Sequence, residues 1–134
     1  MEEKDIQEAA IKREYLARQF DALQKESAKF EQMLTEVIVT QNALKELEKA
    51  KEDKETLIPA GSGVFVNGVI KKADTVMTNM GENVVIEKSI KEVLGMLKGK
   101  EEAIKKNLNE IEKSLNHIKK DYNELTSIIE SARK

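Results

Sequence analysis

Apolar residues recur every seven positions through the first part of the chain. If Ile6 takes the first position of the repeat (a), the fourth positions (d) are Ala9, Leu16, Leu23, Phe30, Val37 and Leu44. The a positions alternate between apolar and polar residues: Ile6, Arg13, Phe20, Ser27, Leu34 and Gln41. This repeat predicts a helix that supercoils against a partner helix. The β-branched run at residues 35–40 disfavours helix, but the repeat continues through it, so we predict helix throughout.

The last part of the chain carries the same repeat more regularly. Its d positions are Ile90, Leu97, Ile104, Ile111, Ile118, Leu125 and Ala132. Its a positions are Leu94, Glu101, Leu108, Leu115, Tyr122 and Ile129, among which Glu101 is the polar exception. Ser89 followed by Glu92 forms a capping box, which predicts that this second helix starts at Ser89.

The segment between these helices changes to a strand-like pattern. It contains the single Pro and four of the six Gly residues, and its β-branched and aromatic runs are typical of strands. In the first predicted hairpin, a short strand at residues 56–58, ended by Pro59, is followed by a glycine-rich turn at 60–63 and a longer strand at 64–70. In the second predicted hairpin, a strand at residues 75–79 is followed by a turn at 80–82, which contains Gly81, and a strand at 83–87.

The chain is therefore predicted to be one α+β domain over residues 1–134, a long antiparallel coiled-coil hairpin with two β-hairpins inserted between its helices. The expected limits are about 2–54 for the first helix, 56–87 for the β insert and 89–133 for the second helix. Residues 1–55, 56–88 and 89–134 carry net charges of −4, 0 and +2, which weakly favours pairing of the two helices with each other. The alternative is that each helix pairs with another chain.

The β insert carries more apolar strand residues than one small chain can cover. Two isolated hairpins are marginal in water and leave exposed edges. The insert is therefore predicted to mediate oligomerisation. The residues expected to lie in that interface are Val64, Phe65, Val66, Val69, Ile70, Val76, Val84, Val85 and Ile86.

Composition narrows the possible functions. Charged residues make up 36% of the 134 residues and aromatic residues 4%, with no Cys, one His and a net charge of −2. These values argue against a disulfide scaffold, a thiol nucleophile, a multi-histidine metal site and nucleic-acid binding. An acidic N-terminus and the lack of a long apolar run predict a cytoplasmic protein without a signal peptide or membrane span.

No chemistry-bearing motif points to an enzyme. The glycines at residues 61–63 and 99 are not followed by the Lys-Ser/Thr pair of a nucleotide-binding loop. His117 falls on the outer face of the second helix, and paired carboxylates such as Glu2-Glu3 lie in lysine-rich helices. We therefore expect no catalytic residue, cofactor or metal.

Two stretches of the β insert resemble the archaeal prefoldin alpha subunits. Residues 57–68 read Leu-Ile-Pro-Ala-Gly-Ser-Gly-Val-Phe-Val-Asn-Gly, which is similar to the family's first hairpin. Residues 81–89 read Gly-Glu-Asn-Val-Val-Ile-Glu-Lys-Ser, which is similar to its second hairpin and the start of the second helix. The presence of a second hairpin favours the alpha over the beta type. The turn of the second hairpin departs slightly from the family's pattern: this chain has Glu82-Asn83 there, whereas an aromatic residue is expected near Val84.

The resemblance implies a hexamer of two alpha-type and four beta-type subunits, whose hairpins form a β-barrel base carrying six coiled-coil arms. It further implies a chaperone that binds unfolded polypeptides without ATP and passes them to a group II chaperonin.

Two alternatives come from other classes of protein. One is a structural or adaptor coiled coil that assembles through its hairpins. The other is a factor that inserts a coiled coil into an enzyme channel. It is disfavoured because such a factor usually needs a short acidic turn between its helices, whereas this chain has the apolar β insert there.

Client binding is expected where the chain ends meet, at residues 1–20 and 118–134. Ile11 and Tyr15, four residues apart, lie outside the seam, as does Ile128. Exposed apolar side chains there would suit targets that display apolar surface without a defined shape. The full set expected to bind clients is Ile6, Ile11, Tyr15, Tyr122, Leu125, Ile128 and Ile129.

Two pairs of residues elsewhere each have two possible roles. Ile38 and Val39 lie off the seam in the middle of the first helix, where they could meet a client or another subunit. Gly95 and Gly99 could allow close packing on the β portion or a neighbouring chain, or could simply loosen an exposed face.

Overall fold

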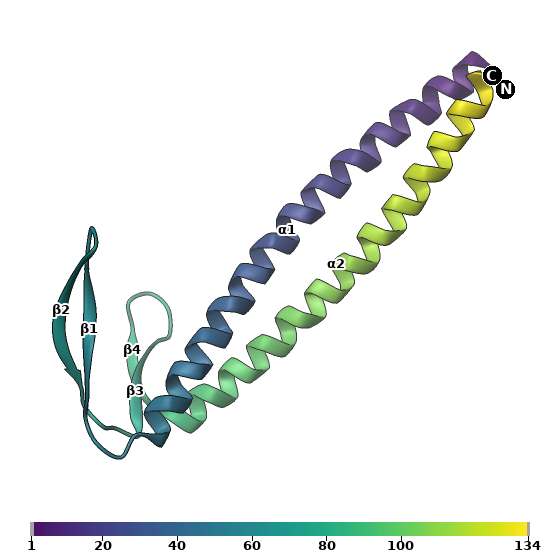
Figure 1. Ribbon diagram of the computed structural model, residues 1–134. Coiled ribbons are helices and arrows are strands. Elements are labelled where there is room, and N and C mark those ends of the chain that lie inside the picture. The colour runs from purple at the N-terminus through teal and green to yellow at the C-terminus, as the bar shows by residue number, and fades with distance from the viewer. Residues whose placement is uncertain (1, 134) are drawn as a thin grey trace. The chain divides into compact units, whose positions relative to one another are not determined.

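The computed structural model describes residues 2–133, which form two long helices separated by four strands (Figure 1). The elements in chain order are α1 (Glu3–Lys49), β1 (Lys54–Gly61), β2 (Val64–Ile70), β3 (Thr75–Asn79), β4 (Val85–Ser89) and α2 (Ile90–Arg133). They belong to two compact units. A terminal unit contains residues 2–35 and 102–133, and a central unit contains residues 36–101.

Both units pack α1 against α2 in antiparallel fashion, which confirms the predicted intrachain hairpin (Figure 1). In the terminal unit, Arg13 near the start of α1 contacts Tyr122 and Thr126 near the end of α2. Every predicted a and d position of both helices is buried or half-buried. The seven-residue repeat therefore identified the seam correctly along its whole length, because its period matches the crossing of two supercoiled helices.

The two helices are closely matched in length. α1 has 47 residues and α2 has 44, so each is about 70 Å long at ~1.5 Å per residue. α1 ends at Lys49, before the predicted limit near residue 54. No Gly or Pro marks this end. The loop at residues 51–53 is polar, and the Asp53 carboxylate accepts a hydrogen bond of 2.7 Å from the Lys72 backbone N–H.

The first hairpin pairs β1 with β2 and is longer than predicted. β1 runs from residue 54 through Pro59 to Gly61, whereas the sequence predicted a strand of 56–58 ended by Pro59. Proline is tolerated because a two-stranded sheet has an open edge on each strand, so the missing N–H breaks no necessary ladder bond. The register shifts between Pro59 and Gly61. The turn at Ser62 and Gly63 then takes positive φ angles of 52° and 77°.

The second hairpin pairs β3 with β4 and forms a separate two-stranded sheet. β3 has the predicted bounds, but β4 begins at Val85 instead of residue 83. Glu82 and Asn83 have φ angles of 50° and 64°, which places them in the turn. Val84 also precedes the strand, and its backbone N–H bonds to the Gly81 carbonyl at 2.9 Å. The fold contains no closed barrel within the described chain.

Packing of the second hairpin against the helices forms the core of the central unit. Leu44, Ile90 and Val93 are buried together, and the partly buried residues around them are Leu47, Val76, Leu94 and Leu97. The Ile90 backbone N–H donates to the Asp74 carbonyl at 2.9 Å. The Ser89 hydroxyl caps α2 by accepting the Glu92 N–H at 3.1 Å, as the capping box predicted.

The seam of the central unit also contains two buried polar side chains, Gln41 and Glu101. Both occupy a positions, where an apolar residue would pack better. Lys98 Nζ lies 3.1 Å from Glu101 Oε2 and compensates part of the buried charge. Polar groups at single a positions can specify the register of a coiled coil at a cost in stability.

Candidate functional site

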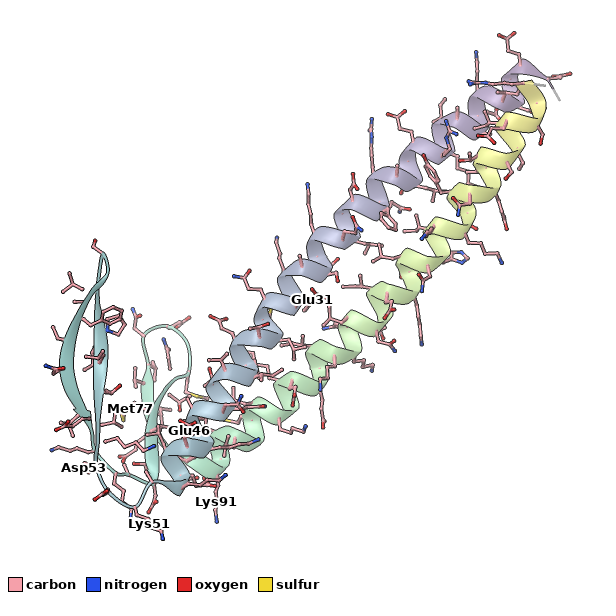
Figure 2. All side chains as sticks on the ribbon, in the orientation of Figure 1. Glu31, Glu46, Lys51, Asp53, Met77 and Lys91 are labelled. Carbon is pink, nitrogen blue, oxygen red and sulfur yellow. The ribbon has the colours of Figure 1, made fainter. Side chains whose placement is uncertain are left out.

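The strands of the two hairpins expose most of their apolar side chains. We call Val64, Phe65, Val66, Val69, Ile70, Val85 and Ile86 the β surface. Their exposed fractions range from 42% to 59%. Side chains stand on both faces of each hairpin (Figure 2), and each sheet has only two strands. Exposed apolar side chains gathered in this way are typical of sites that contact another protein.

Two residues predicted to belong to this surface are placed differently. Val76 is partly buried, because it packs against the Leu44–Ile90–Val93 core of its own chain. The prediction that Val76 needs a partner subunit to cover it is therefore wrong. Val84 is exposed but lies in the turn before β4 instead of in a strand.

Sequence reasoning missed four further exposed residues in the hairpins: Leu57, Ile58, Met77 and Met80. Ile58 pairs with Val66 across the first hairpin. Leu57 and Ile58 could have been found from that predicted pairing, because a strand opposite an exposed apolar strand lies in the same two-stranded sheet. The two Met residues have no such signal in the sequence.

The terminal unit exposes Ile11, Tyr15 and Ile128 outside the seam, as predicted, and also Met33, which was not predicted. Ile11 is 69% exposed and Tyr15 is 60% exposed, on one outer face of α1. The Gln19 amide donates a hydrogen bond of 3.1 Å to the Tyr15 hydroxyl and orients that ring. Ile128 of α2 is also exposed, beside a shallow hollow lined by Ser127, Ser131 and Ala132.

The seam residues of this unit are less available than predicted. Ile6, Tyr122 and Leu125 are half-buried. Ile129 is only 2% exposed, so it cannot contact a client while the helices remain paired. Its prediction as a client-binding residue is wrong because an a position surrounded by the facing helix is covered even close to the chain end.

Arg13 forms a small polar cluster that the sequence did not predict. Its Nη1 donates to the Thr126 hydroxyl at 3.4 Å, and its guanidinium carbon lies 5.8 Å from the centroid of the Tyr122 ring. The Thr126 hydroxyl in turn donates to the Tyr122 carbonyl at 3.0 Å. These contacts hold Tyr122 against α1 and explain how an arginine is accommodated at an a position.

The middle of α1 exposes Ile38 and Val39 off the seam, in the central unit. On α2, Gly95 and Gly99 face open space: apart from the adjacent residues and backbone of α2 itself, no described atom lies within 4 Å of where a Cβ would be. These glycines therefore do not serve close packing on the β portion of their own chain.

Titratable side chains on the helices form surface pairs. His117 Nε2 lies 3.3 Å from Asp121 Oδ2 on the exposed face of α2. Within residues 2–133, no three His, Asp or Glu side chains are grouped in a way that could hold a metal ion. No described helix is long and apolar enough to cross a membrane.

Comparison with known sequences places the chain beside archaeal chaperone subunits. Residues 3–134 match the family model described as Prefoldin subunit. Prefoldin subunit alpha 1 of Methanocaldococcus jannaschii is 29% identical over 130 residues, covering 97% of this chain and 84% of that protein. Prefoldin subunit alpha of Methanosarcina acetivorans is 28% identical over 109 residues, covering 79% of this chain and 77% of that protein.

Solved structures share the fold. A chain of the filamentous prefoldin from Methanocaldococcus jannaschii superposes with a TM-score of 0.71 at 21% identity, covering 90% of this chain and 98% of that one. The prefoldin beta subunit from Thermococcus strain KS-1 has a TM-score of 0.63 at 20% identity, covering 96% and 91%. The predicted arrangement of two long helices around two β-hairpins is therefore confirmed.

Proposed function

The chain belongs to the prefoldin family of chaperone subunits, and from this premise we propose that it captures unfolded polypeptides with the paired ends of its two helices. The observation that carries this proposal is the exposure of Ile11 and Tyr15. The coiled coil does not need these side chains for its own seam. Their apolar area is free to contact a client, at about 25 cal/mol per Å² buried.

The residues proposed to meet clients share a place in the terminal unit. They are Ile6, Ile11, Tyr15, Tyr122, Leu125 and Ile128. Each contact is weak, since the exposed side chains are few. Several subunits held in one complex would strengthen binding through effective concentration, without any new type of contact.

Assembly is proposed to occur through the β surface, in a hexamer of two such chains and four beta-type subunits. The open edges of both two-stranded sheets and the exposed apolar strand residues support this arrangement. Strands from several chains would pair these edges and cover the β surface in a shared β-barrel base. Closing a barrel removes sheet edges altogether.

The proposed cycle uses no nucleotide and ends with transfer of the client to a group II chaperonin in the cytoplasm. The glycines at residues 61–63 and 99 lack the Lys-Ser/Thr pair that would hold phosphates and magnesium. Energy for release would come from competition by the chaperonin for the same apolar client surface.

The test compares the assembled complex with one in which Ile11, Tyr15 and Ile128 are all changed to Ser. Dilution of a denatured client is followed by light scattering, with and without ATP and without chaperonin. We expect the parent complex to suppress aggregation equally in both conditions. The triple variant should protect less well while its mass and melting temperature stay nearly unchanged.

Three results would count against the proposal. Equal protection by the triple variant would place client binding elsewhere, on the beta-type subunits or near Ile38. No protection by the parent complex would favour a structural or adaptor role. A nucleotide dependence of protection by the purified complex would contradict the proposed ATP independence.

A further inference from the structure

Lysine side chains gather along one side of α2 in the terminal unit. Counted on from the a positions of the repeat, they fall at e and f, which adjoin position b around a helix that turns about 100° per residue. Between residues 105 and 123, these three positions carry five lysines, three asparagines and one carboxylate, Glu112, and all nine side chains are exposed. We call this surface the lysine stripe. Its members besides Glu112 are Lys105, Lys106, Lys113, Lys119, Lys120, Asn109, Asn116 and Asn123.

The other side of α2 carries the opposite charge. Positions c and g in the same stretch include Glu110, Asp121 and Glu124 and no lysine or arginine. His117 also lies there, with its Nε2 3.3 Å from Asp121 Oδ2. The chain as a whole has a net charge of −2, so the lysine stripe is a local concentration of positive charge on an acidic protein.

The lysine stripe is poorly neutralised within its own chain. Apart from Lys105, its lysines have no carboxylate within ion-pair distance in the described part of the chain. Lysines on a helix surface are commonly balanced by carboxylates three or four residues away. Asparagines stand at those positions here: Asn116 is four residues before Lys120, and Asn123 is four residues after Lys119.

The three asparagines also weaken the helix. Asparagine is a poorer helix former than glutamate. The amides of all three form no hydrogen bond with other groups among residues 2–133, so no contact within the subunit offsets this cost. Glutamate at the same positions would strengthen α2 and neutralise the lysines. The asparagines instead leave the positive charge available and add amide N–H donors beside it.

The spacing of the lysine stripe fits a helical partner. Lys106, Lys113 and Lys120 recur at seven-residue intervals, which is about 10.5 Å along α2. A second helix laid along α2 repeats at the same distance, so carboxylates at every seventh position would meet all three lysines. An extended chain covers that distance in about three residues, and side chains three apart point to opposite faces.

We propose that the lysine stripe docks an acidic helix of a partner protein, whose Asp or Glu residues recur every seven positions and accept hydrogen bonds from the asparagines between the lysines. The stripe contains no apolar side chain, so the contact is ionic, reversible and weakened by salt. Nucleic acid fits less well, because the stripe has no arginine for phosphates and a long polyanion would reach the acidic side of α2. This inference goes beyond the proposed function and involves none of the residues proposed to meet clients.

The test measures binding of a fluorescein-labelled helical peptide to the assembled complex by fluorescence anisotropy, at about 20 mM salt where screening is weak. The peptide is built from alanine and glutamine with a glutamate at every seventh position. One variant combines Lys106→Gln, Lys113→Gln and Lys120→Gln. The matched control changes three exposed lysines of α1 in the same unit, Lys12, Lys25 and Lys29, to Gln and so removes the same charge.

We expect the stripe variant to bind the peptide roughly tenfold more weakly, at about twofold to threefold for each exposed pair, and the α1 control to stay within about twofold of the parent. A second variant changes Asn109, Asn116 and Asn123 to Glu. Its new carboxylates should pair with the lysines inside α2. The melting temperature should hold or rise while peptide binding falls by about tenfold or more, which separates docking from folding.

Four results would overturn the inference. They are no peptide binding by the parent complex at low salt, equal losses for the stripe variant and the α1 control, parental binding by the glutamate variant, and tighter binding of a single-stranded oligonucleotide of equal charge. The last result would assign the lysine stripe to nucleic acid. The stripe variant should still suppress aggregation of a denatured client as the parent does, so docking and client binding can fail independently.

Discussion

Assembly through the β surface makes a sharp prediction for Val66. Its side chain is 48% exposed in the single chain, and it pairs with Ile58 across the first hairpin. Val66→Asp therefore puts a carboxylate where water can still solvate it, and the isolated subunit should keep its helical content. The same holds for Val85→Asp in the second hairpin, where the valine is 51% exposed.

The free-energy cost of Val66→Asp appears only when subunits associate. Burying the remaining half of a valine side chain contributes about 1 kcal/mol, and that contribution is lost. An aspartate buried without a partner adds several kcal/mol of desolvation penalty. A total of about 4 kcal/mol for each contact corresponds to a roughly thousandfold weaker association, and each copy of the subunit carries the same defect.

The assay is size-exclusion chromatography with light scattering, after mixing each variant with the beta-type partner, beside circular dichroism of the variant alone. Val66→Ala is the matched control. It removes apolar area without adding charge, so it should weaken assembly by only about 1 kcal/mol. A complex of normal mass formed by Val66→Asp at micromolar concentration would refute the reasoning, because a buried interface cannot tolerate that charge.

Two further predictions concern the seam. Leu115→Ser removes an apolar side chain from an a position of the terminal unit and should destabilise the arm by about 2 kcal/mol or more, seen as a lower melting temperature in circular dichroism; an unchanged melting temperature would show that this part of the seam is already loose. Glu101→Leu replaces a buried carboxylate, paired with Lys98 at 3.1 Å, and should stabilise the subunit by about 1 kcal/mol. A lower melting temperature for Glu101→Leu would instead mean that the polar layer holds the helices in register.

The seam was readable from the sequence because helix pairing repeats a simple local rule. Each a and d residue, including polar ones such as Arg13 and Gln41, is buried or half-buried where the repeat places it. A side chain's position around a helix follows directly from its number in the chain, so one periodic signal locates the whole interface. The two sheets were also found, because their β-branched runs and glycine turns are local signals.

The ends of elements were less predictable. α1 stops at Lys49 without a Gly or Pro to mark its end, and β1 passes through Pro59 where the sequence suggested a stop. Both errors arise from reading single residues as boundaries. A proline ends a strand only if its missing N–H is needed by a neighbour, and that depends on which strand edge is free.

The sequence by itself therefore determined the two helices, their seam positions, the two inserted hairpins and the apolar excess of the β surface, and the structure decided that the two helices pair within one chain. The tertiary structure decided which of those apolar residues remain available. Val76 turns inward onto the Leu44–Ile90–Val93 core, although most other apolar strand residues of the hairpins stay exposed. Ile129 is buried although it lies close to the chain end. Exposure is a property of what packs opposite a residue, and that neighbour comes from a distant part of the chain which no local pattern specifies.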